Sequence, residues 1–202
     1  SKSFNYLLES KLINWKVKPA FDKGKFLGKG CFGEVRRADF PDTENSYKKI
    51  ALKMTGFKSP QDKDQLLTEI SVMKAFSKST YAAKFYGCVT EGYSTVYLVQ
   101  DLLDHNLGST SFRDEIRTQT CSESLALYLQ MFMGAKDLWE VGFTHNDIKP
   151  ENMMADKYNK RAYLIDFGRA QLNTEYNKPL GTLIFMSPNK FRRGKPVKLI
   201  DD

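Results

Sequence analysis

Residues 145–152 read His-Asn-Asp-Ile-Lys-Pro-Glu-Asn, and residues 166–168 read Asp-Phe-Gly. Phosphoryl transfer from ATP needs a carboxylate to orient the attacking hydroxyl, an amide and a second carboxylate to hold magnesium, and a cation for the moving phosphate. The chain offers these groups as Asp147, Asn152, Asp166 and Lys149. The interval between the two segments suits a short hairpin that returns the second carboxylate beside the first. Together they predict ATP-dependent phosphoryl transfer with Mg²⁺.

A glycine-rich stretch lies upstream, where residues 28–35 read Gly-Lys-Gly-Cys-Phe-Gly-Glu-Val. The same spacing opens dinucleotide-binding folds, but there it runs from a strand into a helix. Here the flanking residues lack helical apolar spacing, which predicts a strand, a glycine hairpin and another strand. Glycine lets the backbone approach phosphates without a Cβ atom in the way. An ordinary glycine turn is the alternative for this motif taken alone.

The next predicted strand covers residues 49–54. Side chains alternate across a strand, so the even-numbered apolar residues share one face, and Ala51 and Lys53 share the other. The small side chain of Ala51 leaves room for a flat base, and Lys53 can reach the α and β phosphates. The alternative is a solvated lysine on an edge strand.

Residues 61–76 have helical apolar spacing, and Glu69 shares a face with Val72 and Phe76. A carboxylate on an apolar face needs a partner, and Lys53 is the predicted one. The alternative places Glu69 at the solvent border of an amphipathic helix.

Two further segments have predictable structure. Residues 40–46 are rich in turn-forming types and predict a loop between strands. Residues 120–123 have the spacing of a capping box, which predicts the start of a helix. That helix carries an apolar stripe made of Leu125, Leu129, Phe132, Ala135 and Leu138. Leu127, Met131 and Trp139 widen the stripe, so most of the helix is expected to be buried.

With these motifs in place, the chain resembles a eukaryotic protein kinase over about residues 21–202, and Lys-Pro-Glu-Asn at 149–152 is similar to the serine/threonine branch. The resemblance implies an α+β, two-lobe fold with a mostly β N-lobe that carries one key helix. The implied organisation is a helical extension at residues 1–20, an N-lobe at 21–103 and a partial C-lobe at 104–202. The helical C-lobe would be incomplete, because residues 201–202 look like a cut through a motif.

The resemblance also implies individual roles. Asp147 would be the catalytic base, and Lys149 would contact the γ-phosphate of ATP. Asn152 and Asp166 would hold Mg²⁺. The residues implied in nucleotide binding are Leu27, Gly28, Gly30, Gly33, Val35, Ala51, Lys53, Glu69, Asp101, Leu103 and Met154.

Residues 98–103 resemble the hinge of the casein kinase 1 group, with Gln100 as gatekeeper and Leu103 offering its backbone N–H to adenine. Ser-Pro-Asn at 187–189 and the last five residues are also similar to that group. This resemblance implies protein substrates that are acidic or already phosphorylated, and the net charge of +7 agrees with acidic partners.

Three residues near the proposed base carry separate predictions. Asn146 stands where regulated kinases have an arginine that binds a phosphorylated activation loop, so we expect activity independent of loop phosphorylation. Thr182 would bridge Asp147 and Lys149 through its hydroxyl, unless it is only a turn residue. His145 is predicted to be a packed structural residue.

Composition narrows the setting. The lysines are dispersed without interleaved aromatic residues, which argues against nucleic acid as a partner. No apolar run is long enough for a membrane span. Three scattered cysteines suit a reducing compartment, so an intracellular location, cytoplasmic or nuclear, is expected.

Two other functions stay open at this point. One is a catalytically impaired, nucleotide-binding scaffold, which an incomplete C-lobe and Asn146 would favour. The other is a small-molecule kinase of the aminoglycoside or choline type, although these generally lack the glycine loop and the Lys-Pro-Glu-Asn run.

Overall fold

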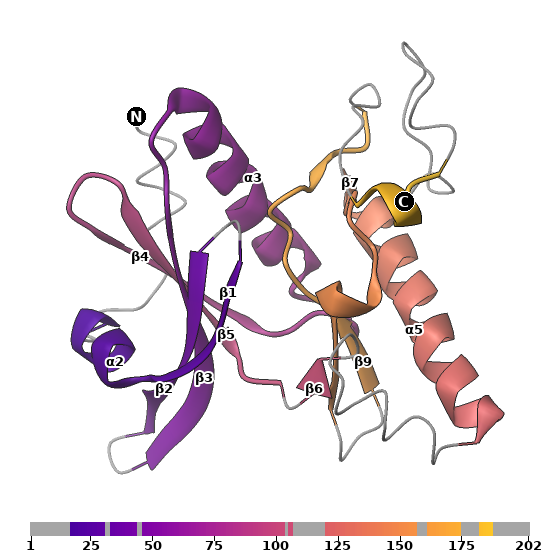
Figure 1. Cartoon of the computed structure of the whole chain (residues 1–202), viewed down its shortest axis with the longest axis horizontal. Coiled ribbons are helices and arrows are strands. Elements are labelled where there is room, and N and C mark those ends of the chain that lie inside the picture. The colour runs from indigo at the N-terminus through magenta and orange to yellow at the C-terminus, as the bar shows by residue number, and fades with distance from the viewer. Residues whose placement is uncertain are drawn as a thin grey trace. The chain divides into compact units, whose positions relative to one another are not determined.

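The computed structural model describes residues 17–30, 33–43, 46–103, 105–106, 120–156, 161–174 and 182–187. The chain divides into two compact units, which we call the first and the second unit (Figure 1). The first comprises Ser1–Lys74 and Lys84–Leu102, and the second comprises Ala75–Ala83 and Leu103–Asp202. Residues 1–16 of the predicted helical extension lie outside the described residues, as do residues 188–189 and 198–202 of the motifs that resemble casein kinase 1.

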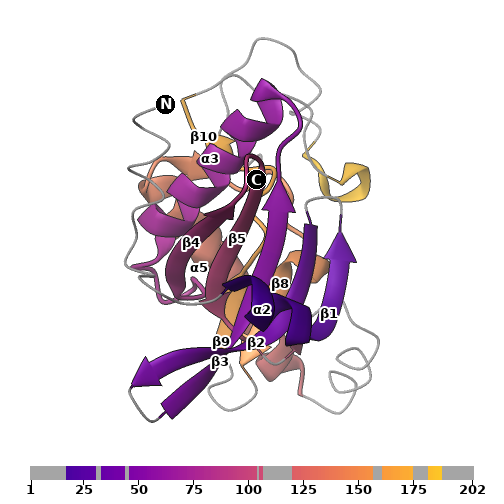
Figure 2. The same ribbon diagram turned by 90° about the vertical axis from the view of Figure 1, so that its left-hand side faces the viewer.

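The first unit is built on a five-stranded antiparallel sheet in the order β1-β2-β3-β5-β4 (Figure 2). Its strands are β1 (Lys25–Gly30), β2 (Gly33–Thr43), β3 (Ser46–Gly56), β4 (Phe85–Glu91) and β5 (Thr95–Asp101). Its helices are α2 (Val17–Lys23) and α3 (Pro60–Phe76), the latter entering the second unit at Ala75. The predicted strand at 49–54 and the predicted helix at 61–76 are confirmed.

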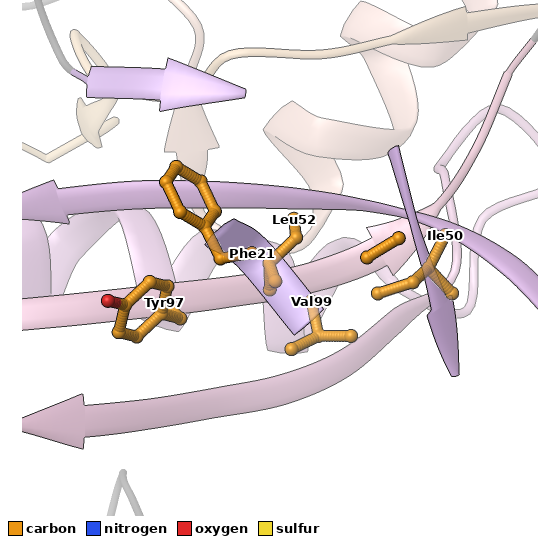
Figure 3. Packing of buried hydrophobic residues seen from close by; sticks show 6 residues of the cluster. Phe21, Ile50, Leu52, Tyr97 and Val99 are labelled. Atoms are coloured by element: carbon orange, nitrogen blue, oxygen red, sulfur yellow. The ribbon is translucent and has the colours of Figure 1, made fainter. Parts of the chain in front are cut away.

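One apolar cluster covers a face of this sheet (Figure 3). Ile50 and Leu52 point into it from β3, as their alternation predicted, and Tyr97 and Val99 join them from β5. Phe21 enters from α2, with its ring centroid 5.5 Å from that of Tyr97 in an edge-on arrangement. Because side chains alternate, Ala51 and Lys53 are left for the opposite face.

The predicted loop at residues 40–46 is wrong. β2 continues to Thr43, β3 begins at Ser46, and Pro41 pairs with Tyr47. Proline is tolerated because β1 pairs with β2 only as far as Arg37, so among the described strands the rest of β2 has no partner on that side. The register is also irregular between Pro41 and Thr43, another setting in which proline occurs in strands.

The glycine hairpin between β1 and β2 is confirmed, with Gly30 opposite Gly33. Gly33 has a φ of +138°, and a Cβ atom there would overlap the carbonyl oxygen of Met54. At Gly28, by contrast, no atom lies within 4 Å of where a Cβ atom would stand. The backbone conformation thus requires glycine at position 33 but not at position 28.

We therefore expect Gly33→Ala to lower the free energy of unfolding by about 1–3 kcal/mol, because alanine would be strained at this φ. Urea unfolding of the purified chain measures it. Gly28→Ala is the matched control from the same hairpin and should change stability by less than about 1 kcal/mol. Equal losses in the two variants would contradict the assignment.

The second unit contains one long helix, α5 (Cys121–Glu140), and short strands. β6 (His105–Asn106), β8 (Met153–Asp156) and β9 (Arg161–Leu164) form one sheet, and β7 (Phe143–Thr144) pairs with β10 (Gln171–Leu172). Two short 3₁₀ helices follow as η1 (Pro150–Asn152) and η2 (Leu183–Phe185). The antiparallel β8–β9 pair is the hairpin predicted between Asn152 and Asp166.

The start of α5 is confirmed, and its packing is confirmed in part. Thr120 and Glu123 form the capping box. Of the predicted apolar residues, Leu127, Ala135 and Leu138 are buried, together with Gly134. The prediction is wrong for Leu125, Leu129 and Phe132, which are all more than half exposed. Gly134 permits a close approach of the helix, because a Cβ atom there would lie 3.1 Å from Tyr81 and 3.2 Å from Leu164.

Candidate active site

The segment at residues 145–152 connects β7 to β8 in the second unit and ends in η1. His145 is fully buried, and its Nε2 lies 3.0 Å from the carbonyl oxygen of Ile165. Its ring lies 5.3 Å from that of Phe167, which also meets Phe76 at 5.6 Å. His145 is therefore a packed residue, as predicted, and it links this segment to the Asp-Phe-Gly segment.

Asp147 is the centre of a hydrogen-bond network and is only 7% exposed. Its Oδ1 accepts a hydrogen bond from the Thr182 hydroxyl at 2.7 Å. Its Oδ2 lies 2.9 Å from Nζ of Lys149 and accepts from Nδ2 of Asn152 at 3.0 Å. Lys149 donates to the Thr182 hydroxyl at 2.9 Å, so Thr182 bridges the carboxylate and the lysine. The bridging prediction is confirmed, and Thr182 is more than a turn residue.

The charge state of Asp147 follows from these contacts. Burial alone would raise its pKa, but the hydrogen bonds from Thr182 and Lys149, with the charges of Lys149 and Arg169, hold the pKa below its ordinary value. Asp147 is consequently ionised at neutral pH. Because its pKa is low, Asp147 is a weak base. Its main contribution toward a bound hydroxyl would be to accept a hydrogen bond and orient the oxygen.

Replacing Thr182 with valine tests this network. Loss of the hydroxyl donor should raise the pKa of Asp147, which NMR titration of its carboxyl carbon measures. A depressed pKa stabilises the fold above the ordinary carboxyl pKa of about 4, and this contribution is lost as the pH falls through the folded-state pKa. The stability difference between wild type and Thr182→Val should therefore be largest at neutral pH and shrink in acid. Thr182→Ser keeps the hydroxyl and should titrate like wild type; identical midpoints for all three would contradict the interpretation.

Positive φ values mark the two motifs of the second unit. Among the described residues other than glycine, only Asn146 (φ +66°) and Asp166 (φ +61°) have them. Such conformations cluster at functional sites, and asparagine adopts them more readily than most residues. Nδ2 of Asn146 donates to the carbonyl oxygen of Arg169 at 3.2 Å. Asn146 thus ties residues 145–152 to the residues after Asp-Phe-Gly.

A backbone hydrogen bond links the two segments that carry the predicted magnesium ligands. The N–H of Ile165 donates to the carbonyl oxygen of Asn152 at 3.0 Å, which places Asp166 one residue from this contact. Nδ2 of Asn152 is engaged with Asp147, so its Oδ1 is the atom left to bind a cation. Mg²⁺ prefers oxygen ligands and takes few from the protein beside water and phosphate. An amide and a carboxylate fit that ion, although no group of three acidic, His or Cys side chains is found in the described part of the chain.

In the first unit, Lys53 and Glu69 form the predicted pair. Nζ of Lys53 lies 2.7 Å from Oε1 of Glu69, which is 4% exposed. This burial excludes the alternative of a carboxylate at the solvent border. Ala51, two residues before Lys53 on β3, is buried. Val35 lies opposite Lys53 on β2.

The remaining predicted nucleotide-binding residues have varied surroundings. Leu27 is half exposed on β1, and Leu103 and Met154 are half-buried in the second unit. The side chain of Asp101 is engaged by Lys48 and Tyr86, so any contact with nucleotide would come from its backbone.

Three residues near these sites were missed from the sequence. Arg169 has its Nε 4.0 Å from Oδ2 of Asp147, and its position directly after Asp-Phe-Gly was an available signal. Lys48 and Tyr86 had none, because only the strand register brings them to Asp101.

Comparison with known proteins agrees with this geometry. A sequence model of the protein kinase domain matches residues 21–201. A probable LRR receptor-like serine/threonine-protein kinase of Arabidopsis thaliana is 29% identical over 186 residues, covering 86% of this chain and 18% of that protein. Cyclin-dependent kinase B2-1 of the same plant is 28% identical over 184 residues (84% and 57%). A sporulation protein kinase of Schizosaccharomyces pombe is 28% identical over 155 residues (72% and 28%).

These findings define the chain first as a protein with a kinase fold. The match to residues 21–201 then shows that it belongs to the protein kinase family. The predicted α+β fold class, with a mostly β first unit, is confirmed. The chain spans well under two thirds of the length of these relatives. In the described part of the chain, no helix is long and apolar enough to cross a membrane.

Proposed function

We propose that this chain is the catalytic part of an ATP-dependent serine/threonine protein kinase that uses Mg²⁺. The observation that carries the proposal is the network in which Asp147, Lys149, Asn152 and Thr182 share hydrogen bonds. Serine/threonine specificity is supported by the Lys-Pro-Glu-Asn segment and by relatives with that specificity in their names.

In the proposed reaction, Asp147 accepts a hydrogen bond from the hydroxyl of the protein substrate and orients its oxygen toward the γ-phosphate. The bond from this oxygen to phosphorus forms as the bond to ADP breaks, ADP leaves, and Asp147 takes up the hydroxyl proton. Lys149 stabilises the negative charge that spreads over the transferred phosphoryl group. Thr182 holds the side chains of Asp147 and Lys149 in position through its hydroxyl. Asn152 and Asp166 would hold Mg²⁺, which neutralises charge on the phosphates when it is bound. Catalysis is then mainly positioning and electrostatic stabilisation.

The first unit supplies the phosphate-binding groups in this proposal. Glu69 holds the ammonium group of Lys53, which contacts the α and β phosphates. The hairpin that carries Gly28, Gly30 and Gly33 covers the phosphates with its backbone. The residues proposed for adenine binding are Leu27, Val35, Ala51 and the backbone at Asp101 in the first unit, and Leu103 and Met154 in the second.

The substrate class follows from charge. A net charge of +7 favours acidic or phosphorylated protein substrates, and the scattered cysteines support an intracellular location. The relatives described above lend no support to a casein kinase 1 subtype, so that resemblance stays a prediction from residues 98–103.

A transfer assay tests the proposal. The 202-residue chain is incubated with Mg²⁺ and γ-labelled ATP, and label is counted on casein, on a serine/threonine peptide library, and on choline and aminoglycosides. Label on protein hydroxyl groups is the expected result. ATP binding without transfer would instead indicate a scaffold, and label on small molecules alone would indicate a small-molecule kinase; either outcome overturns the proposed activity.

A further inference from the structure

The last residue of β5, Asp101, is held by three hydrogen bonds to neighbouring segments. Its Oδ1 accepts from Nζ of Lys48 on β3 at 2.7 Å and from Oη of Tyr86 on β4 at 2.7 Å. Its backbone N–H donates to the carbonyl oxygen of Lys84 at 2.9 Å, just before β4. Lys48 also donates to Tyr86. We call Lys48, Tyr86 and Asp101 the hinge anchor.

Strand register explains how these three side chains meet. Asp101 pairs with Ile50, and Lys48 lies two residues before Ile50 on the same face of β3, within diagonal reach of the carboxylate. The register of β4 against β5 shifts between Phe85 and Gly87, so Tyr86 is the extra residue of a bulge. A bulge changes the direction of a side chain, and the hydroxyl of Tyr86 points to Asp101 from this bulge.

The ring of Tyr86 has packing partners as well as its hydroxyl. The ring of Phe40 packs at 5.4 Å between centroids, and Nζ of Lys84 and Nζ of Lys48 lie 5.0 Å and 5.2 Å from the Tyr86 centroid. Hydrogen bonds to Asp101 and Tyr86 raise the pKa of Lys48 above its ordinary value, so the lysine is charged at neutral pH. Both ionic groups are partly exposed, and an ion pair of this kind contributes little to overall stability.

We propose that the hinge anchor is a positioning device that holds the end of β5 in the conformation in which the following backbone, through Leu103, binds adenine. This inference rests on the proposed function and extends it to side chains that do not touch the nucleotide. Without the anchor, the strand end has to be ordered when ATP binds, and the cost of that ordering weakens binding. The phosphate-binding groups, Lys53 and the glycine hairpin, lie at other positions of the sheet than the end of β5, and we expect them to keep their affinity.

Calorimetry of the 202-residue chain with two ligands separates these contributions. Dissociation constants are measured for Mg·ATP and for Mg·tripolyphosphate, which lacks adenine and ribose. Asp101→Asn, Lys48→Met and Tyr86→Phe should each weaken ATP binding about tenfold, the amount that a lost hydrogen bond to a charged group produces. Tripolyphosphate binding should stay at the wild-type value in all three variants.

The design includes controls for folding and for charge. Lys49→Met removes the neighbouring lysine, whose exposed ion pair with Asp39 is not part of the anchor, and should leave both affinities unchanged. Tyr86→Phe keeps the packed ring and removes only the hydroxyl, and thermal unfolding confirms that each variant is folded. Unchanged ATP affinity in the variants, or an equal loss for both ligands, would overturn the anchor alone. A wild-type chain that binds no ATP would overturn the proposed function and the anchor with it.

Discussion

Replacing Asp147 with asparagine is expected to slow phosphoryl transfer by about 10²–10⁴-fold, the range that a positioned acid–base group contributes. The asparagine amide cannot take up the hydroxyl proton. Its NH₂ group would also face either Lys149 or Thr182, and each of these donates to the carboxylate in the wild type. Steady-state rates of label transfer from ATP to a protein acceptor measure the loss. Because nucleotide-binding groups are untouched, the KM for ATP should change much less than kcat.

Glu140→Gln is the matched control for this variant. Glu140 lies in the same unit, but it is exposed and pairs with Lys136 along α5, so its loss should leave kcat unchanged. Circular dichroism of both variants shows whether the fold is kept. Wild-type transfer by a folded Asp147→Asn chain would exclude Asp147 as the base.

Replacing Lys53 with methionine is expected to lower the free energy of unfolding by about 3–5 kcal/mol, because the Glu69 carboxylate would stay buried without its cation. Denaturant unfolding of the purified chain gives this value. Transfer activity should also fall, since the phosphates lose a positive contact in the proposed reaction. This stability loss far exceeds what an exposed pair contributes, about 0–1 kcal/mol.

Two further variants make the prediction specific. Lys49→Met alters the adjacent, exposed lysine and should cost less than about 1 kcal/mol. The double variant Lys53→Met, Glu69→Met removes both charges and should recover most of the lost stability, as apolar replacements of buried pairs do. If Lys53→Met were as stable as Lys49→Met, the prediction that Glu69 depends on Lys53 to compensate its buried charge would be wrong.

The parts of the site that follow local rules were predictable. Alternation along residues 49–54 identified which side chains of β3 enter the core and which face away. The capping-box spacing located the start of α5, and the interval before Asp166 located a hairpin. Even the Lys53–Glu69 pair followed, because a carboxylate on an apolar helix face requires a cation.

Other features depend on neighbours that are distant in sequence. Apolar residues surround α5, so their spacing could not identify its packed side, which Tyr81 and Leu164 select by fitting against Gly134. Residues 40–43 have the composition of a loop but form a strand, because β3 offers them a partner. Pairing between β1 and β2 reaches no further along β2 than Arg37.

For this chain, residue types and spacing were enough to specify the chemistry: two carboxylates, an amide and two lysines in the order that phosphoryl transfer uses. Folding in three dimensions decided how that chemistry is held, through the Thr182 bridge over Asp147 and the three strands that meet at Asp101. The physical reason is that side-chain identity and strand or helix period are encoded locally. Register, burial and the choice of packed face are set by groups tens of residues away.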